Sequence, residues 1–151
     1  DSETVQLTEY PLKQLYRNLG KLPAISITVI LEACFSGQSH SGYLSIRTSG
    51  ISVQPTMPNI PDRLTVISAG AANQVASWEK DGSQSLFTKY FLKSMSGDGD
   101  KKPYGNGDGK VSLKELKRYL DTEMSYLARR YYGRVQNAQI TVDGRQILAT
   151  N

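Results

Sequence analysis

Apolar residues along this chain fall into two kinds of pattern. Residues 26–31 and 63–69 are almost entirely apolar or β-branched, and each short run predicts a strand. An uninterrupted run of this kind is typical of a strand buried on both faces of a sheet, so we expect residues 26–31 to form a central strand. Elsewhere apolar residues recur at intervals of three and four, which predicts helices. Strands that alternate with helices indicate an α/β fold, with helices packed on a sheet.

Three helices are predicted, each with a recognisable start or end. The first opens at Pro11, where a missing N–H costs nothing in the first turn, and Gly20 is a plausible stop. The second covers residues 83–95. The third begins at Ser112 and Glu115, which have the spacing of a capping box. The apolar faces consist of Leu12, Leu15, Tyr16 and Leu19; of Leu86, Phe87, Tyr90, Phe91 and Met95; and of Leu113, Leu116, Leu120, Met124 and Leu127.

Three other segments carry turn and loop residues. Residues 36–61 are rich in Ser, Gly and Pro and predict one long, mobile loop, a type of segment that is usually functional. Residues 97–111 form a Gly/Asp-rich insertion between two helices. Near the C-terminus an Asp-Gly pair separates residues 139–142 from residues 145–149, which predicts a β-hairpin.

The composition is that of one globular domain. A chain of 151 residues with 38% hydrophobic and 21% charged residues is neither disordered nor fibrous. No apolar run approaches the roughly 20 residues that span a bilayer. The acidic and polar residues 1–4 are not a signal peptide. We therefore expect a soluble chain with no membrane segment, and the sequence does not indicate its compartment.

The net charge of +4 is concentrated in residues 110–151, partly in the arginine- and tyrosine-rich residues 129–134. A basic cluster with interleaved tyrosines is one way to bind nucleic acid. The other interpretation is a solvated helix end, where cations complement the helix dipole. No nucleic-acid-binding motif accompanies the cluster, so we expect no nucleic-acid partner.

The chain has one cysteine, Cys34, and one histidine, His40. Cys34 follows the first predicted strand, and functional residues of open α/β sheets gather at the carboxyl ends of strands. A thiol there is exposed for nucleophilic attack, and its backbone N–H can stabilise an oxyanion. The alternative is a buried structural cysteine. If Cys34 is a nucleophile, its base is either His40 or a group outside this chain.

Several motifs occur in a fixed order around and after Cys34. Residues 30–37 read ILEACFSG, and residues 66–69 read VISA. They are followed by NQVA at 73–76, by Gly82 and LFT at 86–88, by GNGDGKVSLKEL at 105–116, and by QIT at 139–141. In order and spacing these segments resemble the caspase-like cysteine peptidases of the metacaspase and bacterial orthocaspase type, whose signature is D-x-C-x-S-G. The resemblance covers nearly the whole chain.

This resemblance implies a caspase-like three-layer sandwich, in which a mostly parallel central sheet has helices on both faces. It implies one peptidase domain over residues 1–151, incomplete at its N-terminus, that hydrolyses peptide bonds with Cys34 as nucleophile. By the same resemblance Ser68 and Ala69 line the cleft and hydrogen-bond the substrate backbone. No cofactor is required for such a reaction.

Glu32 stands where the family has the acidic residue of its S1 pocket. Because it lies two residues before Cys34, it projects to the same side of an extended strand. Its carboxylate can pair with the Lys or Arg side chain that precedes the scissile bond. Glu in place of the usual Asp leaves the preference between Arg and Lys open. The alternative for Glu32 is a salt bridge with a cation of the framework.

The family's catalytic histidine precedes its cysteine by about 50 residues. Here 33 residues precede Cys34, and none is His. His40 can serve only if its loop folds back over the thiol, and a solvated loop histidine is the favoured interpretation. Three explanations remain: the histidine lies on a partner fragment of the same precursor, which we favour; the chain is truncated; or the protein is a pseudoenzyme that acts through binding. A missing segment is also expected to leave a sheet edge exposed.

Arg47 is the only basic residue between Cys34 and Pro61. The region after the cysteine is often cleaved during activation of caspase-like enzymes. If the enzyme prefers basic residues, Arg47 is a candidate site of autoprocessing.

A degenerate calcium motif lies in the Gly/Asp-rich insertion. With Gly109 at position 6 of an EF-hand loop, Asn106, Asp108 and Glu115 fall at ligand positions 3, 5 and 12. Position 1 falls on Tyr104, which supplies no carboxylate. The favoured alternative is that residues 106–109 form a turn and Glu115 serves the capping box. A calcium-responsive binding protein is the weakest of the functions considered.

Overall fold

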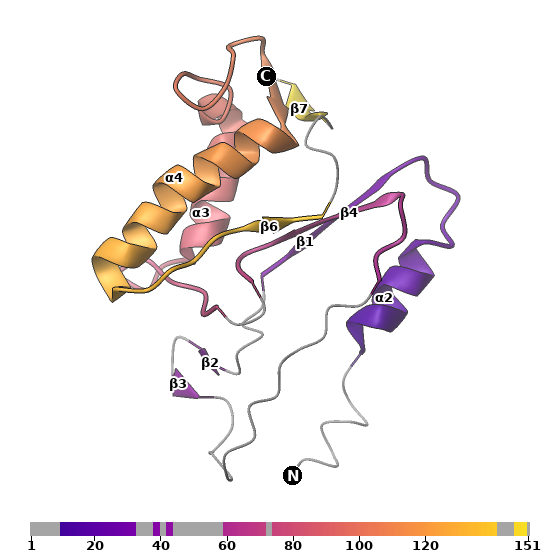
Figure 1. The fold of residues 1–151 in the computed structure, drawn as a ribbon, viewed down its shortest axis with the longest axis horizontal. Coiled ribbons are helices and arrows are strands. Elements are labelled where there is room, and N and C mark those ends of the chain that lie inside the picture. The colour runs from indigo at the N-terminus through magenta and orange to yellow at the C-terminus, as the bar shows by residue number, and fades with distance from the viewer. Residues whose placement is uncertain are drawn as a thin grey trace.

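The computed structural model describes residues 10–32, 38–39, 42–43, 59–71, 74–141 and 147–150, with the backbone alone for 38–39, 42–43 and 147–150. Figure 1 shows a small sheet with helices on two sides of it. Helix α2 is Leu12–Leu19, α3 is Leu86–Lys93 and α4 is Leu113–Tyr132. The strands of the central sheet are β1 (Ile27–Leu31), β4 (Leu64–Ser68) and β6 (Gln139–Ile140).

The sheet has the order β1-β4-β6. Strands β1 and β4 are parallel, with Ile27 opposite Leu64 and Leu31 opposite Ser68. Strand β6 runs antiparallel to β4, with Ile140 opposite Ile67. The carboxyl ends of β1 and β4 therefore lie at the same edge, where the sequence predicted functional residues.

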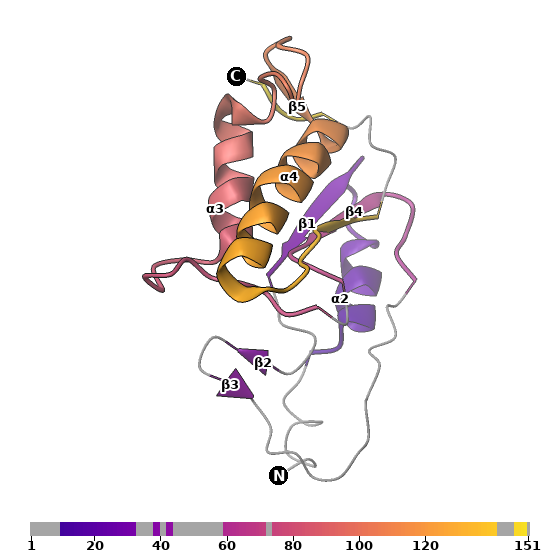
Figure 2. The same cartoon turned by 60° about the vertical axis from the view of Figure 1, so that its left-hand side comes forward.

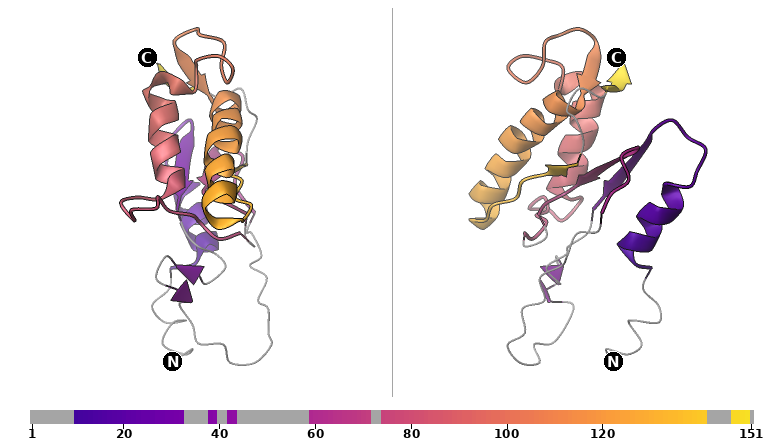
Figure 3. Two further views of the ribbon diagram at one scale, coloured as in Figure 1. Left: turned by 90° about the vertical axis from the view of Figure 1, so that its left-hand side faces the viewer. Right: turned by 45° about the vertical axis from the view of Figure 1, so that its right-hand side comes forward.

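All five residues of β4 are buried. Each face of this strand packs against a different layer of helices. Leu64 and Val66 face α2 and pack with Tyr16. Ile67 and Ala69 belong to the larger core cluster under α3 and α4. Alternate side chains of a strand point to opposite faces, so one fully apolar strand serves both cores. Figures 2 and 3 show α2 on one side of the sheet and the α3–α4 pair on the other. The expected three-layer α/β fold is confirmed, with a small sheet.

Among the described strands, β1 does not have the central position that its sequence predicts. It lies at the edge of the described sheet, and its residues are alternately half-buried and exposed. Ile30 is 48% exposed, although its neighbour Ile67, on the same face of β4, is completely buried. Among the described elements, α3 and α4 cover β4 and leave this face of β1 open. The expected exposed sheet edge is therefore present in the described part of the chain.

The three predicted helices are all present. Pro11 is the N-cap of α2, and Ser85 is that of α3, whose Oγ accepts the N–H of Thr88. The segment η1 (Ser94–Asp98) follows α3 and is kinked at Gly97, which has a φ of 105°. The capping box at the start of α4 is formed as predicted, and α4 ends at Gly133, which has a left-handed φ of 63°.

The described parts of the two predicted C-terminal hairpin arms do not pair with each other. Strand β6 pairs with β4, and the second predicted arm contributes β7 (Ile147–Thr150), which pairs with β5 (Lys110–Ser112). The first pairing occurs at the edge of β4 that β1 leaves open. Thr141 extends this pairing beyond β6: its N–H donates to the Val66 carbonyl, and its Oγ1 accepts the Val66 N–H. Long-range pairing thus outweighs the local turn signal.

Within the predicted loop, β2 (Gln38–Ser39) and β3 (Gly42–Tyr43) form a short antiparallel ladder. Most of the other residues of that segment lie outside the described ones. Of the helices that the structure describes, none has the length and apolarity needed to cross a membrane.

Candidate active site

A cavity of about 410 Å³ opens at the carboxyl end of β1. Glu32, directly after β1, forms one wall. Ala76 and Trp78 come from the segment after β4, and residues 83–85 and Thr88 come from the start of α3. Residues 76–88 therefore surround a carboxylate that lies more than 40 residues earlier in the sequence.

The Glu32 side chain is exposed in this cavity and is held by one hydroxyl group. The Oγ1 of Thr88 donates a hydrogen bond to Glu32 Oε2. Thr88 lies in the first turn of α3, where its own N–H is capped by Ser85 Oγ at 3.0 Å. The second carboxylate oxygen of Glu32 faces no cation among the described side chains.

The alternative that Glu32 pairs with a framework cation finds no support in the described residues. Lys89, one residue after Thr88, binds Glu79 Oε1 at 2.7 Å instead. This hydrogen bond raises the pKa of Lys89. The other described ion pairs, Lys101 with Asp98 and Lys117 with Asp121, lie elsewhere.

Ser68 and Ala69 are not among the residues that line the cavity. Both are buried. The N–H of Ala69 donates to the Leu31 carbonyl at 3.1 Å, and its carbonyl accepts from Gln136 Nε2 at 2.9 Å. Ser68 Oγ donates to the Gly70 carbonyl. Their predicted contact with the substrate backbone stays a prediction, and it requires that a substrate exchange for some of these partners.

Two glutamines fix the segment that carries Trp78. Gln136 is completely buried, and its Oε1 accepts the N–H of Ser77 at 2.8 Å. Gln74 Oε1 accepts the N–H groups of Ala71 and Asn137. A buried amide with its hydrogen-bonding groups occupied holds neighbouring segments in one arrangement. Gln74 lies in the NQVA motif at residues 73–76, whereas no sequence signal pointed to Gln136.

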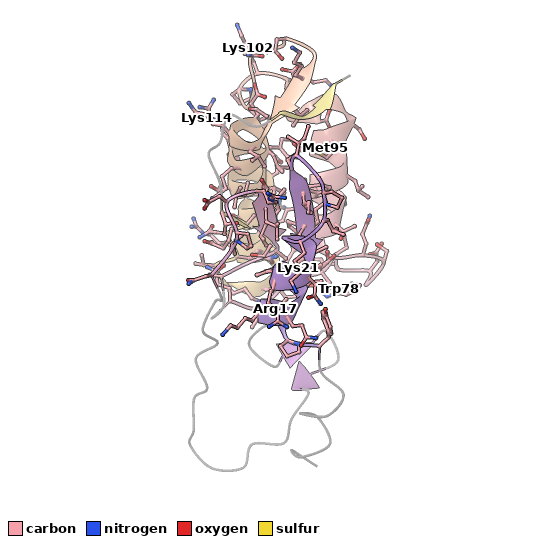
Figure 4. All side chains as sticks on the ribbon, turned by 90° about the vertical axis from the view of Figure 1, so that its right-hand side faces the viewer. Arg17, Lys21, Trp78, Met95, Lys102 and Lys114 are labelled. Carbon is pink, nitrogen blue, oxygen red and sulfur yellow. The ribbon has the colours of Figure 1, made fainter. Side chains whose placement is uncertain are left out.

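The backbone of Trp78 is tied to the two helices that flank the cavity. Trp78 forms a bridge with Ser85, and its carbonyl accepts the hydroxyl of Tyr132 at 2.8 Å. The wall of the cavity is therefore anchored to both α3 and α4. Figure 4 shows Trp78 near the lower end of the part drawn with side chains, with Lys102 and Lys114 near its upper end.

The family model for the caspase domain matches residues 6–144. This chain belongs to the caspase domain family. The family is one of cysteine peptidases, which act on protein substrates. Searches of the curated proteins and of the solved structures gave no match.

In this caspase domain, three of the sequence-based candidates lie outside the described residues. They are the predicted nucleophile Cys34, the lone histidine His40 and the predicted processing site Arg47. Glu32, two residues before Cys34, is the last described residue of its segment.

The calcium candidates of the caspase domain are engaged in hydrogen bonds with its own backbone. Glu115 Oε2 accepts from the N–H and the hydroxyl of Ser112, and Oε1 accepts from the N–H of Asn106. Asn106 Oδ1 accepts the N–H of Asp108, and Asp108 Oδ1 accepts the N–H of Lys110. The capping box of the favoured interpretation is formed, and the absence of a calcium site stays a prediction.

A carboxylate that the sequence analysis missed organises this turn. Asp100 is 7% exposed, and its two oxygens accept the N–H groups of Gly107, Asp108 and Gly109 at 2.8–3.1 Å. Gly105 packs against it so closely that a Cβ there would lie 2.4 Å from the Asp100 backbone. Within the described part of the chain, no group of three or more acidic, His or Cys side chains is placed to hold a metal.

Two tyrosines of the basic cluster near the end of α4 each lie under a cation, one from the cluster and one from outside it. Lys80 lies 4.7 Å from the ring centre of Tyr131, and the Arg134 guanidinium lies 4.7 Å from that of Tyr132. Such cation–π contacts stabilise exposed cations modestly. They fit the interpretation of a solvated helix end.

Proposed function

We propose that this chain supplies the nucleophile and the substrate pocket of a cysteine endopeptidase that cleaves after Arg or Lys. The observation that supports this specificity is the Glu32 carboxylate, which stands in the cavity without a cationic partner among the described residues. An acid beside the aromatic Trp78 suits a long basic side chain, because carboxylates pair with cations and aromatic faces attract them.

In this proposal Cys34 attacks the scissile carbonyl as a thiolate and forms a C–S bond. The backbone N–H of Cys34 donates to the resulting oxyanion. A histidine that has taken the thiol proton returns it to the amine as the C–N bond breaks. The same histidine then removes a proton from water, which attacks the thioester and releases the carboxylic acid product and the thiol.

The histidine belongs to a segment outside this chain, most simply the N-terminal fragment of the same precursor. The open edge of β1 supports this assignment, because an unpaired strand edge with an exposed Ile30 offers a place for a further strand. We call this chain together with that segment the completed enzyme. Ile30→Lys should weaken the association of the two pieces by about tenfold or more, measured by calorimetry. Thr28→Ser, on the same open face, is the matched control. An unchanged affinity in Ile30→Lys would place the segment elsewhere.

The proposal includes the metacaspase or orthocaspase type and processing at Arg47. Mass spectrometry of the active completed enzyme beside its Cys34→Ala variant tests the processing. A cut after Arg47 that appears only in the active enzyme supports it. A cut in both proteins, or in neither, rejects it.

The peptidase proposal itself is tested with fluorogenic peptides that differ only in the residue before the scissile bond. The completed enzyme should cleave the Arg and Lys peptides at least a hundredfold faster than the Asp and Leu peptides, and Cys34→Ala should cleave none. Equal rates on all four peptides would reject the basic pocket. No cleavage by a folded completed enzyme would favour the alternative, a non-catalytic caspase-like module that acts through binding.

A further inference from the structure

The Glu32 carboxylate ends a flexible side chain that is exposed to solvent. Such a side chain has several rotamers, and binding a substrate cation requires one of them. A pocket acid that is already oriented binds its cation more tightly than one that must be ordered during binding. The group that orients Glu32 therefore affects how well the pocket works.

Thr88 is the group that holds Glu32 in the described structure. Its hydroxyl donates to Glu32 Oε2. The donor is itself rigid, because Thr88 is β-branched, lies in the first turn of α3 and has its N–H capped by Ser85. Its neighbour in the helix, Phe87, is almost fully buried and anchors that turn in the core.

The hydrogen bond leaves one carboxylate oxygen uncommitted. Oε2 accepts from Thr88, and Oε1 has no described donor. The adjacent cation Lys89 does not neutralise Glu32, because its ammonium is bound to Glu79. The carboxylate is thus fixed at one oxygen and open at the other, on the wall of a cavity that is large enough for a basic side chain.

We propose that Thr88 is a positioning residue that orients the Glu32 carboxylate for the substrate cation and so sets the strength of basic-residue selection. This inference rests on the proposed pocket. Thr88 touches neither the scissile bond nor Cys34 in this assignment. Its loss should weaken selection of a cation and leave the reactivity of the thiol unchanged.

Two substitutions separate the hydroxyl from the shape of Thr88. Thr88→Val keeps the shape and removes the donor, and Thr88→Ser keeps the donor. Thr122→Val on α4 is a matched control, because the exposed Thr122 hydroxyl bonds only the Arg118 carbonyl, away from the cavity. Because Glu32 is exposed, water can replace the lost bond in Thr88→Val, so we expect all three variants to fold.

The first measurement is steady-state kinetics of the completed enzyme with the Arg peptide. Thr88→Val should lower kcat/KM by roughly three- to tenfold, mostly through a higher KM, which is the size of one hydrogen bond. Thr88→Ser and Thr122→Val should resemble the wild type. Alkylation of Cys34 by iodoacetamide, which needs no pocket, should proceed at the same rate in all four proteins.

The second measurement is binding of agmatine, the decarboxylated form of arginine, by calorimetry, and it needs no catalysis. Thr88→Val should bind agmatine three- to tenfold more weakly than the wild type, and Thr88→Ser should not. Equal binding and equal kcat/KM in Thr88→Val and wild type would overturn the role of Thr88 while leaving the peptidase proposal intact. Agmatine binding that depends on Thr88 in a protein without peptidase activity would reject the peptidase and retain the positioning role. A wild type that does not bind agmatine at all would overturn both the basic pocket and the positioning role of Thr88.

Discussion

The two ends of this domain use carboxylates in opposite ways. At the Gly/Asp-rich end, Asp100 is buried and accepts three backbone N–H groups, and Glu115 accepts from Ser112 and Asn106. At the cavity end, Glu32 is exposed and accepts from one hydroxyl group among the described donors. The carboxylates that stabilise the fold have their oxygens occupied by hydrogen-bond donors, whereas the carboxylate that we propose to bind a cation has one oxygen with no donor among the described residues.

The largest expected effect is a loss of activity on substitution of Glu32, the exposed carboxylate in the cavity. Glu32→Gln removes the charge and keeps the shape, so kcat/KM for the Arg peptide should fall by about a hundredfold, the equivalent of about 2.7 kcal/mol. The melting temperature should change by less than about 2 °C. Asp121→Asn, an exposed acid in a surface ion pair, is the matched control. A variant that unfolds early but cleaves normally when folded would show that Glu32 belongs to the framework.

The opposite result, a loss of stability without a loss of activity, is expected at the buried carboxylate of Asp100. Asp100→Ala leaves three N–H groups without their acceptor, which should lower the free energy of unfolding by about 3 kcal/mol and the melting temperature by roughly 10 °C. Activity per folded molecule should stay within about twofold of the wild type, since Asp100 lies far from the cavity. Thermal unfolding and active-site titration of the completed enzyme measure the two quantities. A stable variant with low activity would contradict the comparison.

Substitutions at two helix caps test the same contrast between stability and activity, with smaller expected effects. Ser112→Ala breaks the capping box of α4 and should destabilise the domain by about 1–2 kcal/mol without affecting selection for basic residues. Ser85→Ala should cost about 1 kcal/mol and should also reduce that selection, because Ser85 caps the N–H of Thr88. Denaturant unfolding and the Arg/Leu ratio of kcat/KM separate the two caps. An identical ratio in both variants would remove Ser85 from the site.

A smaller effect concerns the tyrosines near the Gly/Asp-rich end at high pH. The hydrogen bond to Glu123 raises the pKa of Tyr104 to about 12, and burial raises the pKa of Tyr119 to about 12. The pKa of an unfolded tyrosine is about 10, so the unfolded chain loses these protons first. Their contribution to stability is complete below pH 10 and is lost as the pH rises from 10 to 12. Glu123→Gln should lower the pKa of Tyr104 in an ultraviolet titration, and an unchanged titration would contradict this cause.

The smallest expected effect is the response to calcium. The oxygens of Glu115 and Asp100 are occupied by N–H and O–H donors, so we expect no calcium heat at millimolar ion in a calorimetric titration of the folded protein. A saturable heat that disappears in Asp108→Asn would show instead that the turn rearranges to bind the ion.

Most of the fold was predictable because it depends on local patterns. The caps at Ser112 and Pro11 and the apolar stripes of the helices fix those elements in the sequence itself. The position of β1 was not predictable, since its apolar run is the same whether or not another element covers Ile30. The hairpin prediction failed because the edge of β4 competes for residues 139–141, and no local signal reports that competition.

Glu32 was predictable as a candidate through the resemblance to caspase-like peptidases, and it lines the cavity. The sequence did not show that Thr88 holds Glu32 or that Asp100 holds the turn at residues 107–109. The partner of Thr88 lies far away in the sequence, and the partners of Asp100 lie across a turn. Thr88 is 56 residues from Glu32. Gln136, a single polar residue in a short segment, gives no sign in the sequence that it is buried and bridges two segments.

The central claim is that Cys34 is a nucleophile served by a pocket acid at Glu32. The most direct test is to label the completed enzyme with an Arg-directed acyloxymethyl ketone and to locate the adduct by mass spectrometry. The account predicts an adduct on Cys34 in the wild type, formed at least tenfold more slowly in Glu32→Gln, with equal alkylation of both proteins by iodoacetamide. No adduct in the completed enzyme, or equal labelling of the two proteins, would contradict it.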